Sequence, residues 1–366
     1  MYLQKLSVFN YKNIQEANIE FSPRLNCFFG NNGVGKTNFL DAIYYLSFCK
    51  SHTNPIDSQN IFHEADYFVL QGNYLIEGKE EEYYCAMKRR QKKIFKFNKK
   101  EYERLSDHIG RLPLVIVSPA DENLIREGSD ERRRFMDIAL SQFDHSYMEA
   151  LMSYNKALYQ RNALLKNEQM NREDSLYEMY DAPMSDYARL IYQKRREFIA
   201  AFQPVFEHYY HSVSDRSESI GLQYRSHLEQ GNLQEQLLRS REKDIILGFT
   251  TKGIHKDELE MQIDGYPIKR VGSQGQNKSY LIALKLAQYE YLKQAGKKKP
   301  ILLLDDLFDK LDASRVERII QLVSKEDFGQ IFITDTHREH LNMILQDNGK
   351  DFRVFHIENA CICPIK

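Results

Sequence analysis

Eight residues at positions 30–37, Gly-Asn-Asn-Gly-Val-Gly-Lys-Thr, combine three glycines with a lysine and a hydroxyl group. They follow the apolar stretch "NCFF" and precede "NFLDAIYYLSF", whose apolar residues recur at helical spacing. The run matches the pattern G-x-x-x-x-G-K-[ST] in the strand–loop–helix setting that this pattern requires. Glycines let backbone N–H groups approach an anion, and the N-terminus of the following helix adds partial positive charge. The sequence therefore predicts a phosphate-binding loop at residues 30–37, called the phosphate loop below.

The chemistry of the phosphate loop assigns a part to each residue. Lys36 would supply a mobile positive charge for the β and γ phosphates of a nucleotide, and the Thr37 hydroxyl would ligate Mg²⁺. We find no N-K-x-D pattern that would read a guanine base, so ATP is the expected nucleotide. The remaining contacts to its phosphates would come from Gly30, Asn31, Asn32, Gly33, Val34 and Gly35.

A second element, "PILLLDDLFDKLD" at residues 300–312, supplies the carboxylates that a phosphate loop needs for hydrolysis. Residues 301–304 are predicted to form a fully buried parallel strand. Asp305, at the end of this strand, would hold Mg²⁺ through water, and Asp306 would polarise the attacking water as a general base. The alternative is a strand that simply runs into a surface turn.

A third element, "VGSQGQNKSYLIALKLAQYEYL" at residues 271–292, predicts a helix with an exposed N-terminus. Ser273 is a suitable N-cap, and Gly275 allows close approach of the backbone. Together with Gln274 and Gln276, these residues would form a second anion site. The alternative is an ordinary capped helix.

The charge balance is neutral overall, with 51 basic and 52 acidic residues, so the surface is not uniformly basic. Local basic runs lie at residues 88–100, 132–134 and 297–299. Such clusters bind phosphate backbones, although each run alone is also compatible with a solvated loop. For residues 132–134, pairing with acidic groups of the helical stretch at residues 121–244 is an equally weighted alternative to contact with a phosphate backbone.

The cysteines and the apolar runs bear on the compartment. The five cysteines form no CxxC pattern and do not cluster with histidines at metal-ligand spacing, which favours free thiols in a reducing compartment. The N-terminus lacks the pattern of a signal peptide, and no apolar run approaches the roughly 20 residues of a membrane span. We therefore expect a cytoplasmic protein without a membrane partner.

Taken in order, the phosphate loop, S-Q-G-Q, apolar-Asp-Asp and "KLD" resemble the layout of ATP-binding-cassette ATPases. The chain resembles the RecF family of bacterial recombinational repair more closely. This resemblance extends over the whole chain and rests on "VFNYKNI", "KSH", "VSPADENLIREGSDERRRFMD", "YNKALYQRNALLK", "TKGIHKDEL", "SQGQNKSYLIALKLAQ" and "IFITDTH". The chain departs from the family pattern at Asp41 (usually Glu), at Ala120 (usually Glu) and at residues 254–256 (often Pro-His-Arg).

The resemblance implies an α/β fold, namely a P-loop ABC-type ATPase head whose mixed sheet carries flanking helices. Residues 1–120 and 245–366 would form this discontinuous ATP-binding lobe. Residues 121–244, which read as long amphipathic helices, would form an inserted, mostly α-helical lobe. That insert is too short and too irregular for the long heptad coiled coil of SMC and Rad50 heads.

The resemblance also implies an ATP-dependent, two-fold symmetric homodimer. Ser273 and the Gly275 amide of one protomer would contact a γ-phosphate held by Lys36 of the partner subunit. Asp312, in "KLD", would lie at the interface, and either Asp335 or Thr336 would sense the γ-phosphate. Lys12 and Asn13 occupy positions that lie near the nucleotide in related heads.

The implied function is an ATP-gated clamp on DNA. It would bind duplex or single-strand/duplex junctions without sequence specificity, act with RecO and RecR, and help RecA to load. Whether it acts as an enzyme is open, since hydrolysis would be slow and would serve as a switch. Two alternatives stay open: an ATPase subunit of a nuclease- or transport-associated system, and an ATP-binding scaffold without hydrolysis.

Overall fold

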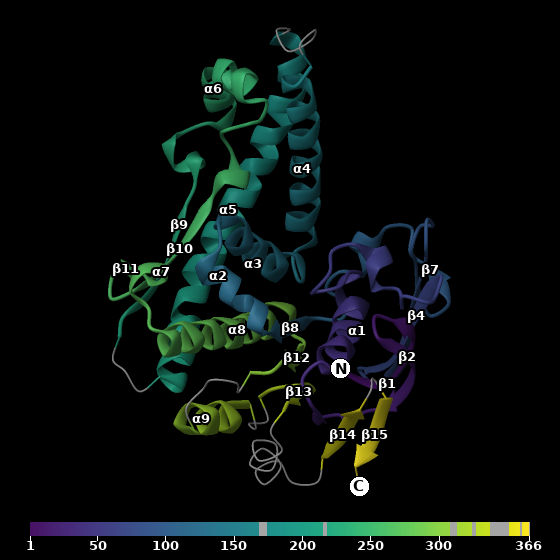
Figure 1. The fold of residues 1–366 in the computed structure, drawn as a ribbon. Coiled ribbons are helices and arrows are strands. Elements are labelled where there is room, and N and C mark those ends of the chain that lie inside the picture. The colour runs from purple at the N-terminus through teal and green to yellow at the C-terminus, as the bar shows by residue number, and fades with distance from the viewer. Residues whose placement is uncertain are drawn as a thin grey trace. The chain divides into compact units, whose positions relative to one another are not determined.

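The computed structural model describes residues 1–167, 174–214, 218–307, 313–323, 327–336, 351–358 and 361–365 (Figure 1). The chain divides into two compact units. The first unit contains Met1–Asp121, Tyr209–Asp215 and Lys278–Lys366, and the second contains Glu122–His208 and Arg216–Asn277. Residues 245–277 thus belong to the second unit, whereas the sequence analysis placed them in the nucleotide lobe. The reason is that residues 258–263 of this segment pair with a strand at residues 220–225.

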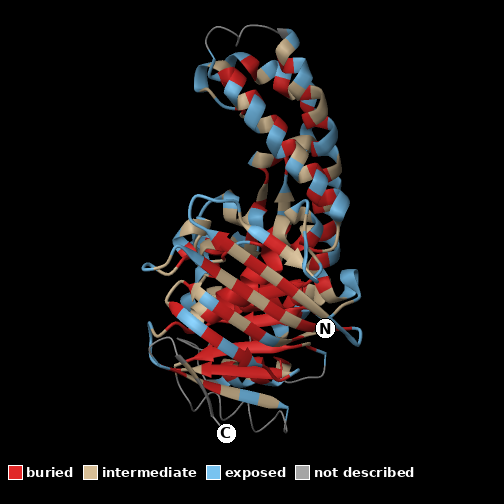
Figure 2. Cartoon of the chain, turned by 90° about the vertical axis from the view of Figure 1, so that its right-hand side faces the viewer, coloured by how far each residue is buried: buried red, intermediate tan, exposed pale blue. Residues whose placement is uncertain are grey.

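An antiparallel sheet forms one half of the first unit. Its strands in spatial order are β2 (Ile14–Glu20), β1 (Tyr2–Tyr11), β4 (Tyr67–Ile76), β5 (Lys79–Lys88), β6 (Ile94–Phe97) and β7 (Lys100–Glu101). Buried and partly exposed residues alternate along β4, because one face of the sheet packs on the core. Figure 2 shows strands that alternate in this way between red and tan. Glu77 and Gly78 both have positive φ, as the two-residue turn between β4 and β5 requires. All the strand pairs of this sheet are antiparallel.

A mostly parallel sheet forms the other half of this unit. Its order is β15 (Cys361–Ile365), β14 (Phe352–Glu358), β3 (Leu25–Phe29), β13 (Ile331–Asp335), β12 (Ile301–Leu304) and β8 (Leu114–Val117). Only β15 pairs in the antiparallel sense. The strand predicted at residues 301–304 is β12, fully buried between β8 and β13. The carboxyl ends of β3, β12 and β13 therefore meet at one edge of the sheet, and their amino ends meet at the opposite edge.

Helix α1 (Lys36–Phe48) packs between the two sheets, against β1, β4 and β5 of one and β8 and β13 of the other. It is buried almost all round, which explains why its apolar residues do not form a single stripe. An aromatic cluster joins this helix to the parallel sheet, with Phe28 stacked on Phe39, Phe332 and Phe355. The core thus fixes the phosphate loop at both of its ends.

The second unit is largely helical. Its helices α2 (Glu122–Arg126), α3 (Ser129–Ser141), α4 (His145–Leu165), α6 (Leu233–Leu247) and α7 (Ile268–Val271) are joined by most of α5 (Asp174–Val213) and the start of α8 (Gln274–Gly296). Helix α9 (Ala313–Val323) belongs to the first unit. Short 3₁₀ turns lie at Asp57–Asn60, Leu105–His108, Pro119–Asp121, His227–Gln230 and Ile254–Lys256.

A small antiparallel sheet in the second unit was not predicted. It consists of β9 (Ile220–Arg225), β10 (Glu258–Ile263) and β11 (Tyr266–Pro267). Pairing of β10 with β9 carries residues 258–263 into this unit, which moves the boundary away from residue 245. The predicted ATPase-head class with an inserted helical lobe is otherwise confirmed, and the described residues contain no long coiled coil.

Buried charges hold the second unit together. Arg161 on α4 is fully buried and bonds to Asp181 on α5 at 2.6 Å and to Asp244 on α6 at 2.9 Å. Arg195 on α5 donates to the Tyr147 hydroxyl on α4 at 3.0 Å, so α4 and α5 lie side by side (Figure 1). A buried pair of this kind costs much when one partner is removed, because the other charge is left uncompensated.

Arg161→Met should lower the free energy of unfolding by about 3–5 kcal/mol, because it strands two carboxylates in the core. Urea unfolding followed by circular dichroism measures this. The matched control is Arg239→Met on α6, whose exposed side chain pairs with Glu235 at 3.4 Å and should contribute less than about 0.5 kcal/mol. Equal effects of the two changes would contradict a structural role for the buried pair.

Candidate nucleotide-binding site

The phosphate loop connects β3 to α1, as predicted. Gly35 is the N-cap of α1 with φ 108°, and a Cβ there would lie 2.8 Å from Nδ2 of Asn13. At Gly30 a Cβ would lie 2.4 Å from the carbonyl oxygen of Ile357 on β14. Asn13 also accepts a hydrogen bond from Asn38 on α1 at 2.7 Å. Glycine is therefore required by the packing of the loop as well as by its backbone conformation.

Lys36 begins α1 and is only 4% exposed. Its ammonium donates to the carbonyl oxygens of Gly30 at 2.8 Å and Asn31 at 3.1 Å. In the described part of the chain no carboxylate forms an ion pair with it. A buried cation whose partners are neutral is costly, and a polyanion would supply the missing countercharge.

Asp305 follows β12 at the carboxyl edge of the parallel sheet. Its Oδ1 accepts from the Thr37 hydroxyl at 3.0 Å and from the Thr334 hydroxyl on β13 at 2.7 Å. Its backbone N–H donates to the carbonyl of Val117 on β8 at 2.8 Å. The structure thus brings together the predicted Mg²⁺ ligands Thr37 and Asp305, which are far apart in the sequence.

Burial raises the pKa of Asp305 from 3.8 to about 6. The hydrogen bonds from Thr334 and Thr37 oppose this rise, the neighbouring charge of Asp306 adds to it, and Lys36 opposes it. The charged carboxylate is therefore held at a cost that a bound cation would offset. In the described residues, no group of three His, Cys, Asp or Glu side chains could hold a metal. A pair such as Thr37 and Asp305 suits Mg²⁺, which keeps several waters and takes few protein ligands.

Asp306 has φ 43°, in the left-handed region that aspartate tolerates only at some cost. Its backbone N–H donates to the Thr334 hydroxyl at 2.9 Å, which fixes this conformation. Thr334 therefore contacts both aspartates. The sequence analysis named Asp335 or Thr336 as the sensor and gave no role to Thr334, whose only sequence cue was its place at the end of the strand "IFIT". Asp335 is the last residue of β13 and Thr336 follows it.

A second polar cluster at the N-terminal half of α1 centres on Asp41. This buried carboxylate accepts from the Tyr11 hydroxyl at 2.6 Å, from Ser51 Oγ at 2.7 Å and from the His52 backbone N–H at 2.6 Å. Lys12 forms an ion pair with it at 2.5 Å. Burial raises the pKa of Tyr11, so the phenol stays a donor. Sequence reasoning noted Asp41 only as a departure from the family pattern, yet it joins α1 to the segment after it and to the end of β1.

Ser273 and its neighbours form a reciprocal cap at the start of α8. The Ser273 hydroxyl accepts from the Gln276 backbone N–H at 3.2 Å, and the Gln276 side chain accepts from the Ser273 N–H at 2.7 Å. Gln276 also donates to Glu218 at 2.8 Å. Ser273 and Gln274 are exposed, and Gly275 is partly exposed. The predicted N-cap is confirmed, and it lies in the second unit, whereas the phosphate loop lies in the first. Asp312 lies outside the described residues.

Three cysteines of the first unit have buried thiols. Cys27, Cys49 and Cys85 are free, and burial raises the pKa of Cys27 and of Cys49 to about 12. These cysteines are therefore inert core residues. No described helix combines the length and the hydropathy that crossing a bilayer would need.

The comparisons with known proteins agree with this geometry. The family model of the RecF/RecN/SMC N terminal domain matches residues 2–362. The DNA replication and repair protein RecF of Parabacteroides distasonis is 58% identical over 366 residues, which is the full length of both chains. The protein of the same name from Porphyromonas gingivalis is 50% identical over 364 residues, covering 99% of this chain and 100% of the relative.

Two solved structures have folds similar to that of this chain. One is described as the recombination mediator protein RecF-ATP in the RecFOR pathway; it aligns with a TM-score of 0.89 at 27% identity and covers 100% of this chain and 98% of its own. An Smc head domain from Pyrococcus furiosus aligns with a TM-score of 0.59 at 17% identity over 100% and 96%, which shows likeness of fold alone. With a phosphate loop after β3, two adjacent aspartates after β12 in the same sheet, and full-length relatives of this identity, the chain belongs to the RecF family of DNA replication and repair proteins.

Proposed function

We propose that this protein is an ATP-gated DNA-binding switch of replication and recombinational repair. The observation that carries the proposal is the cluster in which Asp305 receives hydrogen bonds from Thr37 and Thr334 beside the buried Lys36. It joins the phosphate loop to two strand ends, where a nucleotide triphosphate and its metal would bind. The relatives' name, DNA replication and repair protein RecF, supports the setting.

The residues of the cluster fit ATP with Mg²⁺. Lys36 would turn from the loop carbonyls to the β and γ phosphates, and Thr37 and Asp305 would hold the cation. Bound Mg²⁺ would neutralise charge that develops between these phosphates. Asp306, held at the same edge by Thr334, would orient and polarise the attacking water. Hydrolysis serves here as a timer that ends the bound state, which fits a slow ATPase.

A dimer would complete each site. The N-terminus of α8 offers an exposed Ser273 hydroxyl and backbone N–H groups at the positive end of a helix of 23 residues. These groups would meet the γ-phosphate bound by Lys36 of the partner subunit. Because ATP then contacts two protomers, it links nucleotide binding to dimerisation.

The basic runs at residues 132–134 and 88–100 differ in whether their side chains are bound within the protein. Arg132 bonds to Glu258 at 2.7 Å and Arg133, only 9% exposed, donates to the Asp257 carbonyl at 2.7 Å. These two arginines hold β10 to α3, as the structural alternative for residues 132–134 supposed. In the run at 88–100, Lys93 pairs with Asp57 at 2.7 Å. The exposed cations of that run lie around the β5–β6–β7 edge of the antiparallel sheet and are Lys88, Arg89, Arg90, Lys92, Lys99 and Lys100.

We assign DNA contact to this β5–β7 edge. Its cations are exposed and lie in a short segment, so they can follow a phosphate backbone without reading bases. Duplex or single-strand/duplex junctions are the expected substrates, in the cytoplasm. The RecFOR pathway named for the structural relative supports RecO and RecR as partners.

Binding of Mg²⁺–ATP should weaken as the pH falls below about 6. The folded pKa of Asp305 lies above its ordinary value, so the carboxyl takes up a proton near pH 6, and the proton competes with the cation. The Mg²⁺-dependent part of the affinity should fall about tenfold per pH unit below that point. Isothermal titration calorimetry from pH 5 to 8, with and without Mg²⁺, measures it.

Asp305→Asn is the matched control, since it keeps the hydrogen bonds but carries no titrating group. The nucleotide's own titration is common to both proteins and cancels in the comparison. Identical pH profiles for the two proteins would exclude Asp305 as the metal-holding carboxylate.

Light scattering with and without ATP and Mg²⁺ tests the gated dimer. The unchanged protein should become a dimer only with ATP, and Lys36→Met should remain monomeric because it loses the phosphate contacts. Asp306→Asn should still dimerise with ATP, and its dimer should persist because hydrolysis no longer ends it. A monomer under every condition, with ATP bound, would refute the composite site.

Lys99→Gln with Lys100→Gln should weaken DNA binding and lower the slope of log affinity against log salt by about 2, one for each lost phosphate contact. Fluorescence anisotropy with a labelled duplex over a salt series measures the slope. Arg239→Gln with Lys243→Gln removes two exposed charges from α6 and should leave it unchanged. Equal losses from both pairs would mean that only net charge matters and that the β5–β7 edge is not the contact.

A further inference from the structure

A pocket of about 560 Å³ opens at the edge of the parallel sheet opposite to the nucleotide site. It is formed by the segments that lead into three parallel strands and so lies at their amino ends. Arg24 directly precedes β3, Lys299 lies just before β12, and Gln330 directly precedes β13. The phosphate loop and Asp305 follow the carboxyl ends of β3 and β12. Since a strand of five residues spans roughly 16 Å, a ligand in this pocket would not touch bound nucleotide.

The floor of the pocket is apolar and rigid. Phe328 and Ile76 line it and are 6% and 7% exposed. The buried Gln330 accepts from the Leu3 N–H at 2.7 Å and donates to the carbonyls of Leu3 and Ser22 at 2.8 Å each. These bonds join β1, the segment before β3 and β13. The pocket is therefore preformed, because its walls are held by bonds between elements that are distant in the sequence.

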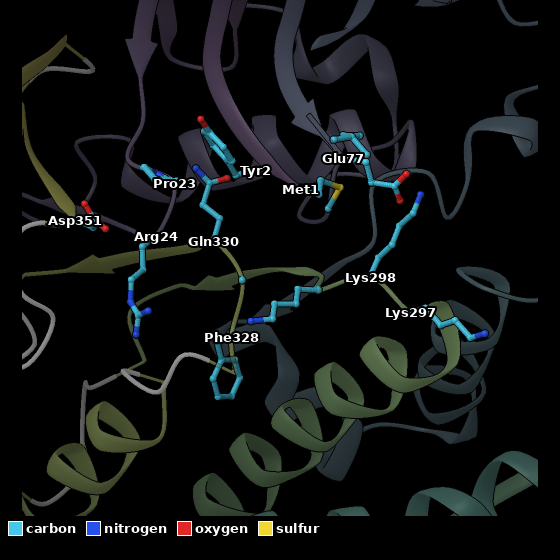
Figure 3. Close-up of a pocket in the computed structure, with 13 residues that line it drawn as sticks. Met1, Tyr2, Pro23, Arg24, Glu77, Lys297, Lys298, Phe328, Gln330 and Asp351 are labelled. Carbon is cyan, nitrogen blue, oxygen red and sulfur yellow. The ribbon is translucent and has the colours of Figure 1, made fainter. Parts of the chain in front are cut away.

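The rim of the pocket is basic. After α8 ends, Lys297 turns with φ 53° and is followed by Lys298 and Lys299. Arg24 lies across the pocket from Lys297 and Lys298 (Figure 3). Among the lining residues with charged side chains, these four cations face two carboxylates, Glu77 and Asp351. Within the described residues, neither Lys297 nor Lys298 forms an ion pair. This is the basic run at 297–299, which the nucleotide and DNA assignments leave without a role.

We propose that this pocket binds an acidic peptide segment of a protein partner, with an aromatic or large aliphatic side chain on the Phe328–Ile76 floor. Carboxylates of the segment would pair with Lys297 and Lys298. The apolar floor favours an acidic peptide over nucleic acid as the ligand. A phosphate backbone gains nothing from apolar contact, whereas an acidic peptide can use both the basic rim and the apolar floor. The pocket is also a local hollow rather than the extended basic surface that a duplex requires.

The position of the pocket allows a peptide partner and a nucleotide to bind at the same time. It lies on the parallel sheet that carries the phosphate loop, at the edge away from the nucleotide. A partner could therefore remain bound while ATP enters and leaves. The pocket holds the protein to a partner, and the nucleotide edge controls its state.

A peptide-display selection tests the proposal with the full-length chain. Random 12-residue peptides are selected on the unchanged protein, with Lys297→Glu/Lys298→Glu as the counter-selected form. Peptides that combine several Asp or Glu residues with an aromatic or large aliphatic residue should be enriched. By fluorescence anisotropy, an enriched peptide should bind at least tenfold more weakly to the double variant. Replacing its acidic residues by amides, or its apolar residue by Ala, should have the same effect.

Matched controls keep the result specific. Lys99→Glu/Lys100→Glu changes the same charge at the β5–β7 edge and should leave peptide binding intact. Both double variants should still bind ATP, which would show that the substitutions leave the fold unchanged. Failure to enrich acidic–apolar peptides, or equal binding by the Lys297→Glu/Lys298→Glu form, would overturn the proposal. Duplex DNA and tripolyphosphate are tested as competitors at the same concentration of negative charge as the peptide. If either one displaces the peptide, the pocket is a nucleic-acid or small-anion site, and the proposal is overturned.

Discussion

The shared hydrogen bonding of the Asp305 carboxylate is the interaction on which the nucleotide edge depends. One oxygen accepts from hydroxyls on α1 and β13, while the backbone of the same residue is bound to β8. The charge is held in a buried place where it is unfavourable by itself, which is typical of sites that await a cation. Thr334 also accepts a hydrogen bond from the backbone N–H of Asp306. Replacing any one of these hydrogen-bonding groups would therefore alter the positions of the others, namely Thr37 in the phosphate loop, Asp305 as the candidate metal ligand and Asp306 as the candidate base.

The parallel sheet of the first unit has two edges that differ in their chemistry. At the carboxyl ends, glycines, hydroxyls and paired aspartates suit phosphate and metal; at the amino ends, lysines surround an apolar floor. The second unit is built differently, around buried arginines such as Arg161 and Arg195 that each bond several groups. Such bonds are directional, so they fix how α4, α5 and α6 pack against one another within the unit.

Much of the nucleotide edge could be predicted from the sequence, because each of its elements is local. The phosphate loop and the buried strand before Asp305 are readable as short patterns with a physical reason. The cap at Ser273, which lies in the second unit, is readable in the same way. The role of Thr334 could not be predicted from the sequence. Its hydroxyl reaches Asp305 and Asp306 only because β13 pairs with β12 in the folded sheet. The fates of Arg132 and Arg133 were equally hidden, because their partners at residues 257–258 lie more than a hundred positions away. Sequence periodicity also missed the β9–β10 pairing, which set the boundary between the units.

The pairing of β3 has a consequence for how the chain is made. This strand carries the phosphate loop, yet both of its neighbours, β13 and β14, are encoded some three hundred residues later, and Gly30 packs against Ile357. During vectorial synthesis the second unit, encoded almost entirely between these segments, is complete long before β3 finds its partners. The loop that binds phosphate is thus among the first parts translated and among the last to acquire its shape. An unfinished chain cannot engage nucleotide, and the long loop closure makes this step slow.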